Sequence, residues 1–551
     1  MQYILVSVTA RGSGTGCLHR SQGPAPDPWR DGCLELSRGG AKAARKRGKD
    51  VKLHRFPKKI RKRLVPEPFG TMRYQCLGCE ESFGIERLLY TCPACGSVLM
   101  LRHEDEESLV RVGGEVWRDL FDYRRMLNHP PLKGIFRYYE FIAPVIPLEE
   151  IVYLGEGHTP LVEANSTLQE LAGASFYFKN DGLNPSASFK DRGMACALSY
   201  LAYIAEKEHL ESPLAICAST GDTSAAAALY ASYLGPLLKS AVLLPKGKVT
   251  PQQLSQPLGS GAKVLEIQGL FDDCMKVVEA LADQYHVALL NSKNSWRILG
   301  QESFSFEIAQ DFDYEVGDKA VILPIGNAGN ITAVMSGFLK FHRAGIIERL
   351  PRIIGVQSSH ADPVYRYYLE PEPHRRRFRP VSVKPSVAQA AMIGNPVSMP
   401  RVIRLVEDYN EAAGAQRVFV VQVSEQEVMD SMILANRNGH VVCTQGGESL
   451  AGLKEAVRRG ILARGETAVL DSTAHMLKFA SFQEMYFEDR FPPEFEVTPD
   501  PGLRNAPLEV RPPGLQRYPQ PGSPLEGEEL ADFVEKMAEE IARILGLKRK
   551  G

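Results

Sequence analysis

The sequence lacks the features that mark several specialised classes of protein. It contains no run of about 18 apolar residues, so a transmembrane helix is not expected. Its formal net charge is only −1, which gives no global field for nucleic acid or a membrane surface. Its ten cysteines are too few for a disulfide scaffold in 551 residues, and they favour a reducing, cytoplasmic setting. The opening M-Q-Y-I-L-V-S-V has no basic n-region, which is not typical of a signal peptide.

The composition is that of an ordinary globular protein. Hydrophobic residues make up 44% of the chain and charged residues 24%. A length of 551 residues predicts roughly three or four structural units.

Residues 1–71 differ from the rest of the chain. Between residues 41 and 63, twelve Lys and Arg residues face a single acid, Asp50. A block of like charge is typical of a disordered segment or an interaction tail, so we predict a disordered basic head. A nucleic-acid-binding arm is a weaker interpretation of the same run. Met72 immediately precedes the first compact module, so an over-extended start is an alternative.

Residues 72–102 contain two Cys-x-x-Cys pairs separated by twelve residues. Four thiolates complete a tetrahedral shell without an open position, so the spacing predicts a small ribbon that holds a structural zinc ion. A ribbon without its metal is the alternative, and no strand–helix context favours a redox pair. The predicted ligands are Cys76, Cys79, Cys92 and Cys95.

Short apolar segments alternate with helical ones after residue 210. L-A-I-C-A-S, S-A-V-L-L-P and A-K-V-L-E-I each precede a helical pattern. This alternation predicts an α/β fold with parallel strands flanked by helices, whose ligands bind beyond the carboxyl ends of the strands.

The segment N-P-S-A-S-F-K-D-R-G, residues 184–193, places Lys190 at the start of a helix. Asn-Pro opens a turn, and the Ala-rich run after Arg192 is typical of a buried helix. Near the positive end of a helix dipole an amine's pKa should fall, which suits a Schiff-base lysine. A surface lysine paired with Asp191 is the alternative that the spacing leaves open.

This segment resembles the lysine segment of the fold-type II pyridoxal 5′-phosphate (PLP) enzymes, most closely that of the threonine synthase family. The resemblance extends over residues 72–545, and L-G-E-G-H-T-P-L at 154–161 matches a segment that precedes the lysine in this family. It implies that Lys190 carries PLP as a Schiff base and acts as the catalytic base. It also implies a two-lobed fold: a helical connector at 103–150, a large PLP domain at 151–184 and 301–490, a smaller mobile lobe at 185–300, and a C-terminal part at 491–551.

The resemblance assigns further cofactor residues. A buried strand runs into a glycine-rich loop that opens another helix, and this loop is a natural cradle for the phosphate of PLP. Asp222 lies near the 3′-oxygen of PLP, and Thr473 faces the pyridine nitrogen, with Ser472 as the alternative. His475 is at least as well explained by core packing. The loop consists of Gly326, Asn327, Ala328, Gly329 and Asn330.

Two further groups are implied for the substrate. The loop S-T-G-D-T-S opens a helix, and Ser219, Thr220 and Thr223 contact the substrate carboxylate. Ser292 and Arg297 grip the substrate phosphate, because a planar guanidinium meets phosphate oxygens two at a time. A surface carboxylate is an alternative partner for Arg297.

The resemblance implies the conversion of O-phospho-L-homoserine and water to L-threonine and phosphate. The second phosphate site favours this reaction over threonine or serine dehydratase, while cysteate synthase would require phosphoserine and sulfite. A non-catalytic zinc-ribbon protein docked on nucleic acid is the alternative from another class. No membrane partner is expected, and the oligomeric state stays open, with a homodimer as one alternative.

Residues 491–551 begin as a proline-rich strap and end in an amphipathic helix. Its apolar residues fall on one helical face, which predicts that the helix docks on the body. They are Leu530, Phe533, Val534, Met537, Ile541 and Ile544.

Overall fold

The computed structural model describes residues 53–210, 213–219, 221–246, 251–269, 271–463 and 465–550. The greater part of the predicted basic head, residues 1–52, lies outside the described residues. The remainder of that head is folded, which corrects the prediction of disorder for it. Ile60 and Leu64 are fully buried, and Arg124 donates hydrogen bonds to the carbonyl oxygens of Leu64 and Arg63 at 3.1 and 2.7 Å. The apolar residues pack inward although the basic ones dominate the composition.

A three-stranded antiparallel sheet with the strand order β2-β1-β3 contains Cys76 at the end of β1, and the other three cysteines lie in the turns beside its strands. We call residues 72–103 the ribbon. The strands are β1 (Met72–Cys76), β2 (Ser82–Gly84) and β3 (Leu99–His103). Two short helices precede the ribbon, η1 (Leu53–Arg55) and α2 (Arg61–Leu64). The segment that follows the ribbon is helical and contains α3 (Glu106–Val112), α4 (Gly114–Arg125), η2 (Pro130–Leu132), η3 (Ile135–Tyr138), α5 (Tyr139–Ile142) and η4 (Leu148–Glu150).

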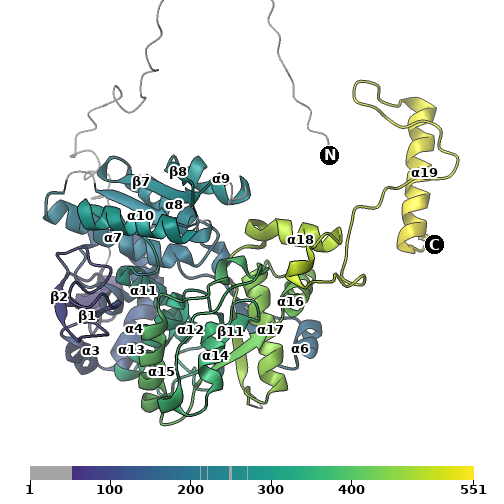
Figure 1. Cartoon of the computed structure of the whole chain (residues 1–551). Helices are drawn as coiled ribbons and strands as arrows, with labels where there is room; N and C mark the ends of the chain where they lie inside the picture. The colour runs from purple at the N-terminus through teal and green to yellow at the C-terminus, as the bar shows by residue number, and fades with distance from the viewer. Residues whose placement is uncertain are drawn as a thin grey trace, which may run out of the picture. The chain divides into compact units, whose positions relative to one another are not determined.

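The larger sheet has six strands in the order β12-β11-β10-β13-β5-β4, all parallel except β4. Its central strands β10, β11 and β13 are buried at every position after the first, because helices cover both faces. Helix α17 packs on β10, β11, β12 and β13 (Figure 1). The strands are β4 (Leu161–Glu163), β5 (Phe176–Lys179), β10 (Lys319–Pro324), β11 (Arg352–Ser358), β12 (Val418–Val423) and β13 (Thr467–Asp471). The helices are α6 (Ser166–Ala172), α12 (Ser303–Asp311), α13 (Gly329–Arg343), α14 (Pro363–Leu369), α15 (Met399–Ala413), α16 (Glu425–Arg437), α17 (Thr444–Arg458) and α18 (Ala480–Phe487), with short η5 (Asp181–Leu183), η7 (Pro373–Arg375), η8 (Gln389–Ala391), η9 (Met476–Phe479) and η10 (Pro493–Phe495).

The smaller sheet has four parallel strands in the order β8-β7-β6-β9, with α8 and α10 packed on it. The two parallel sheets flanked by helices confirm the predicted α/β fold class. The strands are β6 (Leu214–Ala218), β7 (Lys239–Pro245), β8 (Lys263–Ile267) and β9 (Val287–Leu289). The helices are α7 (Lys190–Lys207), α8 (Asp222–Leu234), η6 (Gly235–Leu237), α9 (Pro251–Gly259), α10 (Phe271–Gln284) and α11 (Ser295–Gln301).

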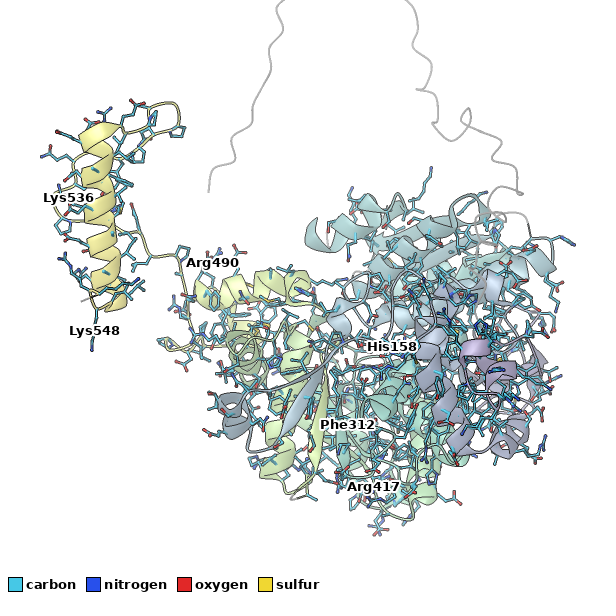
Figure 2. The ribbon with its side chains drawn as sticks, turned by 180° about the vertical axis from the view of Figure 1, so that it is seen from behind. His158, Phe312, Arg417, Arg490, Lys536 and Lys548 are labelled. Atoms are coloured by element: carbon cyan, nitrogen blue, oxygen red, sulfur yellow. The ribbon has the colours of Figure 1, made fainter. Side chains whose placement is uncertain are left out.

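The last helix, α19 (Gly527–Leu545), contains no buried residue. The predicted docking of its apolar face is therefore wrong, with Leu530 44% and Val534 55% exposed. Residues of the strap contact it instead, since Tyr518 meets Phe533 edge-on and Lys536, labelled in Figure 2, donates to the carbonyl oxygen of Gly514 at 3.2 Å. Periodicity shows which face of a helix is apolar but not what covers it.

Among the described residues, the longest helices are too polar to cross a membrane.

Candidate active site

Lys190 is the first residue of α7, and the loop before it docks on the segment that follows β13. The Phe189 N–H donates to the Thr473 carbonyl oxygen at 2.8 Å, and the His475 N–H donates to the Ala187 carbonyl oxygen at 3.1 Å. Ala187 has a φ of 64°, a conformation that a non-glycine residue adopts at a cost and that is often found at functional sites. These contacts bring Lys190 and Thr473, which are far apart in the sequence, into one site.

Two glycines let α11 approach α7 closely. A Cβ atom on Gly300 would lie 2.1 Å from the Arg192 carbonyl oxygen, and one on Gly193 would lie 3.0 Å from the Arg297 carbonyl oxygen. Only glycine fits at position 300, because a Cβ atom there would overlap the backbone of α7. The close approach brings the guanidinium of Arg297 near enough to Lys190 for its positive charge to act on the lysine amine.

The Lys190 amine is set in a desolvated and positively charged environment. Burial and the nearby Arg297 lower its pKa to about 7, while Asp222 and Asp471 act in the opposite direction. Asp191 is buried and accepts a hydrogen bond from the Ser186 N–H at 2.7 Å. The alternative of a surface lysine paired with Asp191 therefore does not fit, and an amine of this pKa is available as a nucleophile near neutral pH.

A buried ion-pair network anchors the first turn of α7. Arg192 donates to both carboxylate oxygens of Asp181, each at 2.7 Å, and to those of Glu307 at 2.6 and 2.8 Å. Lys179 lies 3.2 Å from Glu307. Burial opposes the charged carboxylate, but Arg192 and Lys179 hold the pKa of Glu307 well below its usual range. The network fixes Arg192, which lies two residues after Lys190 in the first turn of α7, and so orients Lys190.

The glycine-rich loop leads from β10 into α13, as predicted. Ala328 has a φ of 61°, and a Cβ atom on Gly326 would lie 2.9 Å from the Ala391 Cα. The first-turn amides of α13 have no partner within the helix, which makes this end a ready anion site. The Asn330 side chain donates to Asp471 Oδ2 at 2.7 Å and ties the loop to the end of β13. The loop therefore fits the phosphate of PLP.

The end of β13 presents polar atoms that lack partners in the described part of the chain. These are Asp471 Oδ1 and Ser472 Oγ, both buried. Thr473 Oγ1 lies 3.5 Å from Cys443 Sγ. Unsatisfied buried polar atoms are rare in native proteins, and they fit a polar ring such as that of PLP. Burial raises the pKa of Asp471 well above its usual range. The sequence patterns assign no role to Asp471, although it ends a buried strand directly before Ser472.

The predicted carboxylate loop precedes α8. Asp222 is buried in the first turn of that helix, and its carboxylate lies 3.0 Å from the Lys478 amine. Ser219 Oγ accepts from the Gly221 N–H at 3.4 Å, and Thr223 is half-buried. Thr220 lies outside the described residues.

Arg297 is 3% exposed and has no carboxylate partner among residues 53–550 as far as these are described. One of its Nη atoms donates to the Leu290 carbonyl oxygen at 3.3 Å, and its buried Nε atom has no partner there. Burial lowers the pKa of Arg297 to about 10. The alternative of a surface carboxylate partner does not fit, whereas a bound anion would satisfy the guanidinium. Ser292 lies five residues earlier and is half-buried.

The ribbon brings its four cysteines together. Their sulfur atoms all lie within 4.8 Å of one another, and Cys76 Sγ lies 3.4 Å from Cys95 Sγ. Four sulfurs so placed are compatible with one tetrahedral metal ion.

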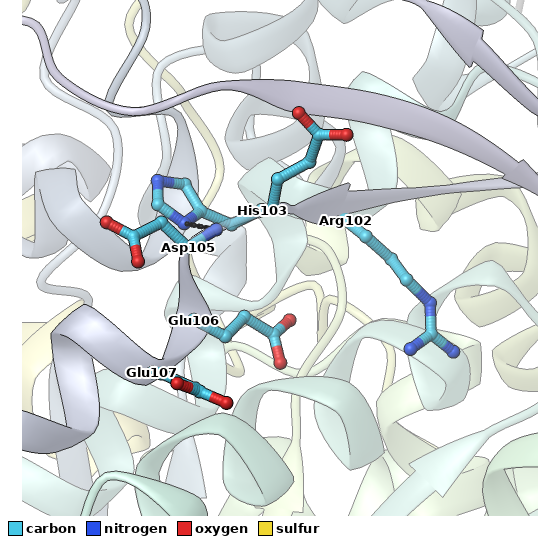
Figure 3. A pocket seen from close by; sticks show the side chains of 6 residues that line it. Arg102, His103, Asp105, Glu106 and Glu107 are labelled. Atoms are coloured by element: carbon cyan, nitrogen blue, oxygen red, sulfur yellow. Dashed lines mark hydrogen bonds between the residues drawn. The ribbon is translucent and has the colours of Figure 1, made fainter.

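A surface pocket lies outside this site, because none of the predicted site residues lines it. The Asp105 N–H donates to His103 Nδ1 at 3.2 Å within it (Figure 3). Its acidic residues are exposed or partly exposed to solvent and need no ligand. The lining residues are Arg102, His103, Glu104, Asp105, Glu106 and Glu107.

Comparisons with known proteins agree with this geometry. The family described as pyridoxal-phosphate dependent enzyme matches residues 152–473. The threonine synthase of Methanocaldococcus jannaschii is 36% identical over 411 residues, covering 74% of this chain and 93% of that protein. Threonine synthase 2, chloroplastic, of Arabidopsis thaliana is 34% identical over 403 residues, covering 72% and 75%. The solved threonine synthase of Escherichia coli shares the fold, with a TM-score of 0.55 and 20% identity over 78% of this chain and 92% of that one. The resemblance seen in the sequence is thus confirmed, and the chain belongs to the family of pyridoxal-phosphate dependent enzymes, among the threonine synthases.

Proposed function

We propose that the chain converts O-phospho-L-homoserine and water into L-threonine and inorganic phosphate, with PLP as cofactor. The observation that carries this proposal is the buried Arg297, which has no carboxylate partner in the described structure and lies close enough to Lys190 to lower its pKa. A dehydratase of free threonine or serine needs no second phosphate site beside the lysine.

Lys190 holds the cofactor, and the loop from Gly326 to Asn330 holds its phosphate. When bound, PLP supplies an electron sink for the substrate's α-carbon. We propose that the Thr473 hydroxyl forms a hydrogen bond with the pyridine nitrogen of PLP. Ser472 is the alternative, because its Oγ has no described partner. A neutral hydroxyl does not force protonation of that nitrogen. Asp222 is assigned to the 3′-oxygen side.

Two anion grips fix the ends of the substrate. Ser219, Thr220 and Thr223 receive the carboxylate, and Ser292 and Arg297 receive the phosphate. Anchoring both ends holds the α-carbon over Lys190 and replaces a bimolecular encounter with an oriented one. Closure of the smaller lobe over the substrate belongs to the proposal, because it would exclude water until the hydration step.

The chemistry of the chain's own groups follows from this placement. An amine with a pKa of about 7 can take the α-proton and return a proton within one turnover at neutral pH. Loss of a β-proton then allows the γ-phosphate to leave, and Arg297 stabilises the dianion that departs. Of the two protons removed, one goes to the γ-carbon and one leaves with the phosphate, while water supplies the hydroxyl of the β-carbon and the proton that Lys190 returns to the α-carbon.

The proposal includes a zinc ion in the ribbon, with Cys76, Cys79, Cys92 and Cys95 as its ligands. Its role is structural, because four thiolates complete the tetrahedral shell and leave no open position. Four reduced thiols favour a reducing compartment such as the cytoplasm. The proposal includes no nucleic-acid or membrane partner and leaves the oligomeric state open. Metal analysis of purified protein should give one zinc per chain, and substitution of Cys79 by serine should lower that content.

The test of the reaction uses the wild type and Lys190→Ala. Both are incubated with PLP and O-phospho-L-homoserine, and phosphate and threonine are measured together. We expect equal amounts of the two products from the wild type and none from the variant. Phosphate accompanied by 2-oxobutyrate would show elimination without hydration and would overturn the proposal, as would the absence of turnover in protein that has bound PLP.

A further inference from the structure

Arg401 of α15 is a second buried arginine without a carboxylate. It is 0% exposed, and in the described part of the chain it forms no ion pair. Burial alone lowers its pKa to about 10. Burying a guanidinium costs free energy unless its N–H donors form hydrogen bonds. The acceptors of these hydrogen bonds therefore show which segments Arg401 holds together.

Those partners are neutral oxygens on three separate segments. Arg401 Nε and Nη2 donate to the Leu99 carbonyl oxygen at 3.0 and 2.6 Å. Its Nη atoms also donate to the carbonyl oxygens of Ser292 at 3.2 Å and Lys293 at 3.0 Å, and to Ser398 Oγ at 3.0 Å. The guanidinium thus joins the ribbon to the loop that carries Ser292.

The glycine-rich loop is connected to the same point. The Ser398 N–H donates to the Asn327 carbonyl oxygen at 3.1 Å. Arg401 therefore lies between the two places where we expect phosphate groups, the loop for PLP and the Ser292–Arg297 grip for the substrate.

The ribbon forms the backing of this arrangement. Leu99 is the first residue of β3 and pairs across the sheet with Cys76, one of the four clustered cysteines. Its carbonyl oxygen also accepts from Ser295 Oγ at 2.8 Å. Trp296 donates to Tyr74 of β1 at 2.9 Å. The first turn of α11, which leads to Arg297, is therefore fastened to the ribbon.

We propose that Arg401 is a positioning residue that fixes the 291–295 loop against the ribbon and so sets Arg297 in the geometry that binds the substrate phosphate. The inference rests on the proposed function. Carbonyl oxygens that Arg401 holds cannot turn toward an incoming dianion and repel it. A loop ordered in advance also loses less conformational entropy when the phosphate binds.

Arginine suits this position better than lysine. Its planar fork carries five N–H donors and can reach several acceptors at once, whereas an ammonium has three donors on one atom. A lysine at 401 would keep the charge but leave some of these carbonyls without a donor.

The test compares holoenzyme variants Arg401→Met and Arg401→Lys with Arg404→Met. Arg404 is on the same helix, its side chain is 54% exposed, and it pairs with Asp408 at 3.1 Å. The measurements are KM for O-phospho-L-homoserine, kcat per bound PLP, and the dissociation constant of inorganic phosphate. For Arg401→Met we expect KM and the phosphate constant to rise about tenfold or more, with a smaller change in kcat. Arg401→Lys should recover part of the loss, and Arg404→Met should stay within about twofold of the wild type.

A purely structural role would give another result. It would lower the fraction of chains that bind PLP while leaving KM and the phosphate constant of the remaining sites unchanged, and that outcome overturns the proposal. If Arg401→Met does not fold, an Arg401→Lys variant with wild-type phosphate affinity overturns it equally. Failure of the wild type to make threonine removes the proposed reaction, while a weaker phosphate affinity in the Arg401 variants would still support the positioning role.

Discussion

At the scale of single residues, the environment of Lys190 joins two effects that usually occur separately. Burial removes water from the amine, and a neighbouring guanidinium without a carboxylate adds positive charge. Both disfavour the ammonium form. The helix dipole, on which the sequence-based expectation relied, acts in the same direction, but burial is the largest cause of the lowered pKa.

The rate at which apoprotein takes up PLP should rise with pH around a midpoint near 7, because only the neutral amine of Lys190 attacks the cofactor. The visible absorbance of lysine-bound PLP, followed after mixing across a pH series, measures this rate. Arg297→Met should move the midpoint upward, since it removes a charge that opposes protonation. A wild-type midpoint near the ordinary lysine value of 10.5 would contradict the assignment.

Glu156 gives a second pH-dependent prediction. It is 1% exposed, accepts from the Tyr230 hydroxyl at 2.9 Å, and burial raises its pKa from an ordinary 4.5 to about 8. The folded state binds this proton more tightly than the unfolded state does. The group therefore stabilises the fold most below pH 4.5, and that contribution is lost as the pH rises to about 8.

Glu156→Gln has no proton to lose, so its free energy of unfolding relative to the wild type should increase steadily over the same pH window. Denaturant unfolding of both proteins at several pH values measures the difference. A difference that does not change with pH would show that Glu156 has no raised pKa.

At the scale of elements, the contact between α7 and α11 depends on the absence of a side chain at Gly300. Gly300→Ala should force the helices apart and cost about 1–3 kcal/mol of unfolding free energy, the usual range for overpacking. It should also raise KM, because Arg297 moves with α11. Thermal unfolding and steady-state kinetics report the two effects.

Gly259→Ala is the matched control, since it ends α9 and an added Cβ atom would meet nothing within 4 Å. Equal effects from the two substitutions would show that the close helix contact is not the cause.

Local patterns predicted the parts of the site that lie within a few residues of one another. Lys190 before its helix, the two cysteine pairs and the glycine-rich loop after a strand are of this kind. Arg401, Lys478 and Asp471 were missed because their partners are distant: Leu99 is 302 positions from Arg401, Ser186 is 292 from Lys478, and Asn330 is 141 from Asp471. No periodicity contains such information, and a lone buried arginine has no sequence signature.

The prediction of disorder for residues 53–71 was wrong because it relied on composition alone. Charge composition indicated disorder, but two apolar residues, Ile60 and Leu64, decide that the segment packs. The C-terminal helix was misjudged in the opposite direction, since its apolar stripe indicated burial and the structure shows exposure.

At the scale of the whole molecule, α19 contains no buried residue, and the buried Leu525 of the strap is not among the clustered apolar residues of the core. A chain that ends at residue 511 should therefore keep the melting temperature and the kcat of the full chain within the error of measurement. Differential scanning calorimetry and the phosphate-release assay test this. A melting temperature lowered by several degrees would show that the helix covers part of the body.

The order of the larger sheet also determines when the site can be completed. Strand β13 lies between β10 and β5, so two groups of strands separated by much of the sequence are joined only by residues 467–471. During synthesis on the ribosome, Lys190 emerges early but waits for β13 before Thr473 can reach it. PLP therefore finds its full set of proposed partners only after residue 473 has been synthesised, and a chain that terminates before β13 would contain Lys190 without the residues that we propose to hold the cofactor.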